Sequence, residues 1–228
     1  MENTKKLENI KVVISGAGSA GYGIFKILKE AGCKNILVTD SKGAIYDERK
    51  DLIIVNSENS NKREIARDSN PRKILGNLEE VIRQADVFIG VSGKAGLVTK
   101  DMVQSMNHDA IVFGLTNPDP EILPSDALKA GARIVCTGRS DFPNQVNNAL
   151  VFPSVLRALL DTRARGLDEQ MLVTASYAIA SLVEKAHLNE VYVIPKVNDP
   201  RILPIVTQTL KEAIGKHALR DSTKTKQS

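Results

Sequence analysis

The chain has 228 residues, of which 42% are hydrophobic and 25% are charged, and its formal net charge is +4 at pH 7. This composition excludes a disordered chain and is typical of a folded globular protein. The charge is small, aromatic residues make up only 4%, and no apolar run reaches the roughly 20 residues that a membrane span needs. We therefore expect no nucleic-acid partner and no membrane, and the polar start, which does not resemble a secretory signal, predicts a cytoplasmic protein.

An apolar run near the start ends in three glycines with the spacing of a phosphate-binding turn, Gly16, Gly18 and Gly21. If a strand leads into this turn and a helix follows, Gly16 permits the tight turn, Gly18 lets a pyrophosphate approach, and Gly21 lets helix and strand pack closely. Ser19 and Ala20 would begin the helix, whose free N–H groups attract an anion. Alone, the motif is also compatible with an ordinary strand-to-helix connection.

A second strand, predicted at residues 35–40, ends in a carboxylate. Asp40 lies 19 residues after Gly21, and an acid about 20 residues beyond such a turn accepts hydrogen bonds from the adenosine ribose. Strand, turn, helix, strand and acid together predict a dinucleotide site. Asp40 favours NAD, and Lys42 or Arg49 is the alternative that would accommodate the extra phosphate of NADP.

Further buried strands are predicted at residues 86–92, 110–116 and 133–137. Ligands of doubly wound sheets lie beyond the carboxyl ends of the strands. Ser92, Gly93 and Asn117 are therefore candidate cofactor neighbours, against the alternative that they belong to ordinary loops. Between the strands we expect helices at residues 61–68 and 78–84, and a further helix that Thr99 caps.

From Pro153 onward the pattern becomes helical. Helices are predicted from Pro153 and at residues 167–188 and 205–219, with a short extended piece at 191–194. The fold class is α/β, a Rossmann-like, doubly wound, mostly parallel sheet with a C-terminal helical extension. The domain division comprises a dinucleotide-binding core at 1–165, helices packing with it at 166–220, and a polar tail at 221–228.

Neither metal nor nucleophile chemistry is indicated by the remaining residues. Cys33 and Cys136 lack metal-ligand spacing and are expected to be buried free thiols. No Ser/His/Asp pattern stands out among the three histidines. We accordingly assign no catalytic residue and no metal ligand to this chain.

Five strings together resemble the NAD-binding domain of malic enzymes, and the resemblance runs in register over nearly the whole chain. The strings are SGAGSAG at 15–21, DSKGAIY at 40–46, DVFIGVS at 86–92, NPDPE at 117–121 and TGRSDFPNQVNN at 137–148, of which the last is the most specific.

This resemblance implies oxidative decarboxylation of malate to pyruvate and CO2, with hydride transfer to NAD or NADP and a divalent Mg or Mn ion. It assigns the pyrophosphate turn to Gly16 through Gly21 and the ribose acid to Asp40. Asn117 and Asn148 would contact the cofactor, and Asn117, Asn147 and Asn148 the substrate. The alternative is that these asparagines only cap loops.

Malic enzymes also carry an earlier domain that supplies a tyrosine acid, a lysine base and the acidic metal ligands. This chain starts shortly before its first strand, predicted at residues 10–15, so we expect those groups, including the metal ligands, to lie outside it. It would then bind cofactor without turnover, as an excised piece or as one half of a split enzyme that needs a catalytic-domain polypeptide. The complete enzyme is expected to be a homo-oligomer. The alternatives are a non-catalytic NAD(H) sensor and, more weakly, another two-domain dehydrogenase.

Overall fold

The computed structural model describes residues 5–53 and 60–224, and the chain divides into two compact units, Met1–Pro143 and Asn144–Ser228. We describe each unit by itself. The boundary differs from the sequence-based division at residue 165, because helix α7 (Phe152–Thr162) packs against α9 (Ile202–Lys224) in the second unit.

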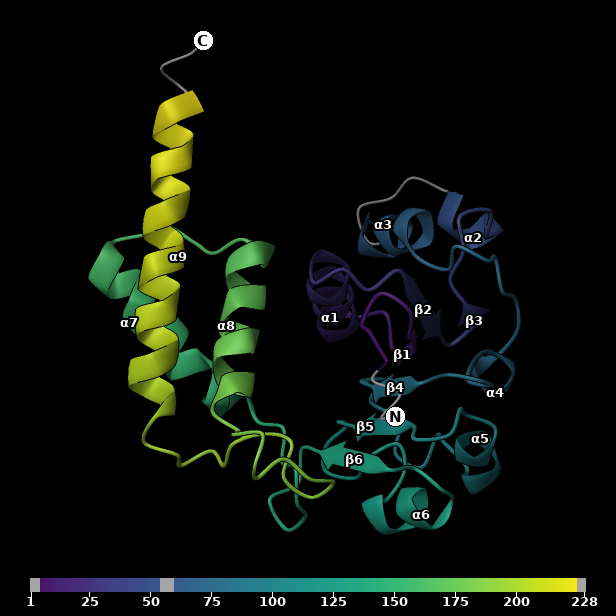
Figure 1. The fold of residues 1–228 in the computed structure, drawn as a ribbon. Helices are drawn as coiled ribbons and strands as arrows, with labels where there is room; N and C mark the ends of the chain where they lie inside the picture. Colours follow the sequence, from purple (N-terminus) through teal and green to yellow (C-terminus); the bar gives the residue numbers. More distant parts are fainter. Residues whose placement is uncertain (1–4, 54–59, 225–228) are drawn as a thin grey trace. The chain divides into compact units, whose positions relative to one another are not determined.

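The first unit is built on a six-stranded sheet with the order β3-β2-β1-β4-β5-β6 (Figure 1). All neighbouring strands pair in parallel except the short edge strand β3, which is antiparallel to β2. This confirms the predicted Rossmann-like, mostly parallel α/β fold. The strands are β1 (Lys11–Ser15), β2 (Asn35–Asp40), β3 (Gly43–Ala44), β4 (Val87–Gly90), β5 (Ile111–Gly114) and β6 (Ile134–Thr137).

Helices cover both faces of this sheet, which explains why its strands are continuous apolar runs. Alternate residues of β1 enter different cores: Val12 and Ile14 pack in one, and Val13 in the other. The Val12 core includes residues of α1 (Ser19–Glu30), α2 (Lys50–Ile53) and α3 (Ser60–Asp68). The Val13 core includes residues of α4 (Leu78–Val81), α5 (Lys100–Gln104) and α6 (Pro124–Lys129).

The second unit is helical and has its own core. A 3-10 turn, η2 (Asn148–Leu150), leads into α7, and α8 (Glu169–Ser181) follows. Helices α7 and α8 both pack against α9 around Ala158, Ile179 and Leu210. As predicted, Pro153 lies in the first turn of α7.

Three elements of this unit differ from the sequence-based predictions. The predicted helix at 167–188 is shorter, since α8 ends at Ser181 and turns follow it. Residues 191–194, predicted to be a short extended piece, form a turn and bends, with a single bridge from Asn189 to Tyr192. Helix α9 runs to Lys224, so residues 221–224 of the predicted tail are helical, whereas 225–228 lie outside the described residues. Polar residues can extend an existing helix because its nucleus has already formed.

Both cysteines are buried free thiols, as predicted. Burial raises the pKa of the Cys136 thiol to about 12, so this thiol stays protonated at neutral pH. Across residues 5–53 and 60–224, no helix combines the length and apolarity needed to cross a membrane.

Candidate cofactor site

A cavity of about 590 Å³ lies at the carboxyl ends of β1, β2 and β4. Doubly wound sheets bind their ligands at this edge, where the strand order reverses direction. Its lining includes the glycine turn at residues 16–18, Asp40 at the end of β2, and Ser92 and Lys94 after β4. A second cavity, of about 540 Å³, lies beside α3 and away from the strand ends, so it is the weaker candidate.

The three glycines of the turn have different neighbours. Gly16 has φ +115°, and a Cβ there would lie 2.5 Å from the Val91 carbonyl oxygen. A Cβ on Gly21 would lie 1.8 Å from the Gly16 carbonyl oxygen, so helix α1 can pack this closely only with glycine at that position. Gly18 is exposed, and a Cβ there would meet no protein atom within 4 Å. The space above Gly18 is therefore open to a ligand.

Helix α1 begins at this turn without a side-chain cap. Its N-cap residue is Gly18, which has no side chain to accept a hydrogen bond from the first N–H groups, and the first turn contains no acidic residue. Ser19 and Ala20, both exposed, are its first residues. Uncapped N–H groups and the positive end of the helix dipole favour an anion, and a dinucleotide pyrophosphate fits that requirement.

Asp40 lines the cavity, but its carboxylate is already heavily paired. Oδ1 accepts hydrogen bonds from Arg49 Nη1 (2.9 Å) and Lys42 N (2.9 Å), and Oδ2 accepts from Arg49 Nη2 (2.6 Å) and Lys62 Nζ (2.9 Å). Burial alone would raise the pKa of the Asp40 carboxyl, but the hydrogen bonds from Arg49 and Lys62 outweigh it and hold that pKa well below its usual range.

Arg49 links Asp40 to a second carboxylate. Its Nε donates to Asp51 Oδ1 at 2.8 Å, and Lys42 Nζ pairs with Asp51 Oδ2 at 3.0 Å. Three cations and two carboxylates therefore gather at the end of β2. The sequence analysis named Arg49 and Lys42 for a phosphate but did not predict the bidentate Arg49–Asp40 pair, since contacts between loop residues depend on the path of the chain.

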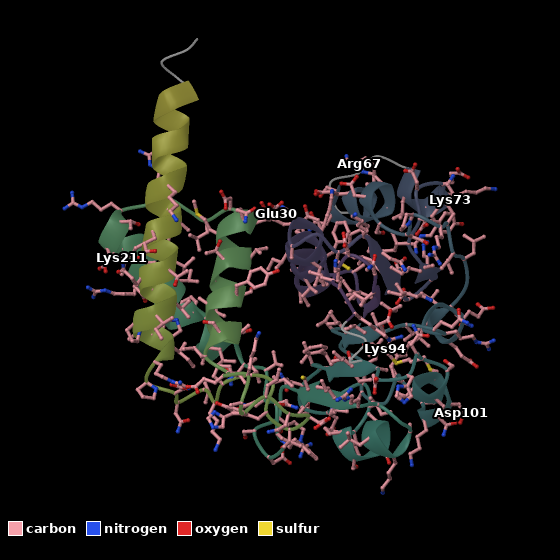
Figure 2. All side chains as sticks on the ribbon, in the orientation of Figure 1. Glu30, Arg67, Lys73, Lys94, Asp101 and Lys211 are labelled. Carbon is pink, nitrogen blue, oxygen red and sulfur yellow. The ribbon has the colours of Figure 1, made fainter. Side chains whose placement is uncertain are left out.

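The segment after β4 is held by a residue that the sequence analysis missed. Ser92 donates from its backbone N–H and from its hydroxyl to the buried carboxylate of Glu121, and Gly93 donates its N–H to the Thr116 hydroxyl. Ser92 lines the cavity, as does Lys94. Lys94 is exposed and is labelled in Figure 2. The sequence did not predict that Glu121 is buried, because Glu121 follows a polar, proline-rich string that is typical of a surface loop.

The predicted asparagines lie in different units. Asn117 follows β5 at the ligand edge of the first unit, and it is exposed. A Cβ on Gly138 would come within 3.1 Å of its side-chain oxygen, so this amide lies over the end of β6. Asn147 and Asn148 are exposed residues of the second unit, where the Asn147 side chain caps η2 by accepting from Ala149 N at 2.9 Å.

The described residues offer no donor set for a metal. Among the side chains that the structure describes, in residues 5–52 and 60–216, no group of three or more His, Cys, Asp or Glu is placed to hold a metal ion. The Mg or Mn ion that the resemblance implies therefore does not fit these residues, and we derive no step through it.

The chain is similar in sequence and in fold to malic enzymes. Residues 1–216 match the family model "Malic enzyme, NAD binding domain". The chain is 50% identical to a bifunctional malic/malolactic enzyme of Bacillus subtilis, over 92% of this chain and 50% of that relative. It is 46% identical to an NAD-dependent malic enzyme of Geobacillus stearothermophilus, over 92% of this chain and 42% of that relative. It is 39% identical to an NADP-dependent malic enzyme of Haemophilus influenzae, over 92% of this chain and 29% of that relative.

The fold comparison gives the same family. The crystal structure of Entamoeba histolytica malic enzyme superposes with a TM-score of 0.89 at 36% identity, covering 94% of this chain and 44% of that one. The chain thus spans about half or less of the length of these relatives. Sequence and fold agree, and the chain belongs to the malic enzyme family as its NAD-binding domain.

Proposed function

We propose that this chain is the cofactor-binding module of a malic enzyme, which converts malate to pyruvate and CO2 by oxidative decarboxylation. The observation that carries the proposal is the cavity between the uncapped start of α1 and Asp40. One end suits a pyrophosphate and the other a ribose. Family membership supports the reaction, and in that reaction bound NAD or NADP accepts the hydride from C2 of malate.

Each predicted residue has a role in this proposal. The turn from Gly16 to Gly21, with Ser19 and Ala20, binds the pyrophosphate through backbone N–H groups. Asp40 accepts the ribose hydroxyls, and Ser92 and Gly93 border the cofactor. Asn117 and Asn148 orient the nicotinamide side of the cofactor, and Asn117, Asn147 and Asn148 bind the substrate.

We propose NAD as the preferred cofactor, with NADP as a tolerated one. Asp40 disfavours the 2′-phosphate of NADP by charge repulsion, whereas Arg49 and Lys62 offset part of that repulsion. Relatives named for each cofactor occur in the family.

Calorimetry with NADH and NADPH on Asp40→Ala and Arg49→Gln tests this choice. We expect Asp40→Ala to weaken NADH binding and to shift preference toward NADPH, and Arg49→Gln to shift it the other way, each by about tenfold, or about 1.4 kcal/mol. Lys73→Gln is the control, because Lys73 pairs only with the exposed Glu48 among the described residues and lies outside the cavity lining. Unchanged NADH affinity in Asp40→Ala would remove Asp40 from the site.

We further propose that the catalytic acid, base and metal ligands come from polypeptide beyond these 228 residues. One fact supports this: the chain spans about half of the length of its relatives. The purified chain should bind NADH yet form none from malate and NAD with Mg²⁺ or Mn²⁺. Robust turnover would contradict this proposal, and restoration of activity by a separate catalytic-domain polypeptide would identify a split enzyme. The complete enzyme is proposed to be a homo-oligomer located in the cytoplasm.

A non-catalytic NAD(H) sensor is the second candidate. One observation favours it, because the Asn147 side chain already caps η2, which reduces its availability to a substrate. NADH titrations with and without malate separate the two functions. Tighter NADH binding in malate supports the enzyme module, and indifference to malate supports the sensor.

A further inference from the structure

Glu121 is a fully buried carboxylate between the segments that follow β4 and β5, with 0% of its surface exposed. Its Oε1 accepts from Ser92 N (3.0 Å), Ser92 Oγ (3.1 Å) and Thr116 Oγ1 (2.5 Å), and its Oε2 accepts from Thr116 N (3.2 Å). A single side chain therefore joins the ends of two neighbouring parallel strands at the ligand edge of the sheet.

The two hydroxyls that donate to this carboxylate also accept hydrogen bonds from backbone N–H groups. Thr116 Oγ1 accepts from Gly93 N at 3.1 Å, and Ser92 Oγ accepts from Lys94 N at 3.2 Å. The N–H groups of three successive residues, 92 to 94, are thus directed toward Glu121, either directly or through one hydroxyl. The loop backbone is fixed, and the Lys94 side chain is left at the cavity, where it is the one Lys or Arg among the described lining residues.

Burying the Glu121 carboxyl costs free energy of folding, because its oxygens lose their contacts with water. Within the described residues no Lys or Arg forms an ion pair with it, so hydrogen bonds alone replace the water that its carboxyl oxygens lose on burial. The sheet also leaves space for it, since a Cβ on Gly90 would lie 2.4 Å from the Glu121 carboxyl carbon. A hydrophobic side chain would fill such a space at lower cost, but it would orient no N–H group.

We propose that Glu121 is a positioning residue for the half of the dinucleotide beyond the pyrophosphate, acting through the segment Ser92 to Lys94. This inference rests on the proposed cofactor site. In a doubly wound sheet the adenosine half lies over β2, where Asp40 is found, and the dinucleotide crosses β1 toward β4. The segment that Glu121 holds follows β4 and is therefore proposed to meet the nicotinamide half, whereas Asp40 meets the adenosine half.

The variant Glu121→Gln tests this in the full chain, with NADH and AMP as probes. Whichever way the amide turns, its NH2 group faces a backbone N–H of Ser92 or Thr116, so the segment must shift. We expect NADH to bind about tenfold more weakly, or about 1.4 kcal/mol, with unchanged affinity for AMP. Loosening of the whole sheet would weaken both probes together.

Asp86→Asn is the matched control. Asp86 is also a buried carboxylate, but it precedes β4 at the opposite edge of the sheet, where it accepts from Lys5 Nζ, Lys11 N and Asn107 Nδ2. This variant should lose stability and retain NADH affinity. Equal NADH affinity in Glu121→Gln and wild type, or an equal loss of NADH and AMP binding, would overturn the inference.

A second pair of variants keeps the test decisive if Glu121→Gln does not fold. Thr116→Val removes the hydroxyl between Gly93 and Glu121, whereas Thr116→Ser retains it. NADH affinity should fall in the first and return in the second, and equal affinities in both would contradict the inference. Failure of the wild-type chain to bind NADH would instead contradict the proposed cofactor site itself.

Discussion

Asp40 and Arg49 act as one charged unit at the end of β2, because each oxygen of the carboxylate already accepts two hydrogen bonds. The side chains of both residues are only 8% exposed, so water screens the pair weakly. A ribose hydroxyl that binds here must share the carboxylate with Arg49 or displace Lys62, which is more exposed. The charge of Asp40 therefore contributes both to the folded chain and to the proposed ribose contact.

The same pairing predicts how stability depends on pH. The folded pKa of Asp40 is depressed, so its contribution is fully present above the unfolded pKa of about 3.9 and is lost as pH falls through the folded pKa. Asp40→Asn removes this contribution at every pH. Urea unfolding from pH 7 to pH 3 should show wild type more stable than the variant at pH 7, with the gap narrowing below pH 4. A gap that stays constant across this range would contradict the Asp40 linkage.

At the scale of elements, helix α1 contains two glycines whose surroundings can be compared. Gly21 and Gly23 lie in the same helix, but a Cβ at Gly21 would meet a backbone oxygen at 1.8 Å, whereas one at Gly23 would meet no atom within 4 Å. Gly21→Ala must therefore push the helix away from the turn, and Gly23→Ala only removes the flexibility of a helical glycine.

We expect opposite results from these two variants. Gly23→Ala should raise the free energy of unfolding by about 0.5–1 kcal/mol and leave NADH affinity unchanged. Gly21→Ala should lower the free energy of unfolding by about 1–3 kcal/mol and weaken NADH binding, because the pyrophosphate turn moves. Urea unfolding and NADH titration measure both effects. Unchanged NADH affinity in Gly21→Ala would show that the turn does not bind the cofactor.

The strands were more predictable than the contacts between loops. The predicted strand at 35–40 coincides with β2, and Thr99 caps α5 as expected, because apolar runs and caps are local signals. Glu121 and the Arg49–Asp40 pair were not predicted, since each depends on which loops the sheet brings together. The ends of α8 and α9 were misplaced because amphipathic periodicity marks a buried face better than it marks a terminus.

At the scale of the whole molecule, the cofactor cavity draws all its lining residues from Met1–Pro143. Helix α7 belongs to the core of the second unit, where Ala158 is fully buried and α9 is its partner. A domain boundary at residue 165 would separate α7 from α9. A boundary at residue 143 would leave both cores intact.

Two truncations compare these boundaries. Fragment 1–143 should unfold cooperatively and retain the AMP affinity of the full chain, because its sheet, both cores and the cavity are complete. Its NADH affinity should be lower, since it lacks Asn148, which is proposed to contact the nicotinamide side. Fragment 1–165 should gain no helical circular dichroism from α7, since an isolated helix of 11 residues is marginal in water without a packing partner. Its unpaired apolar face should also make it more prone to aggregate. If 1–165 binds AMP and 1–143 does not, then residues after Pro143 contribute to the adenosine end of the cofactor site, and the cavity of the first unit is insufficient to hold it.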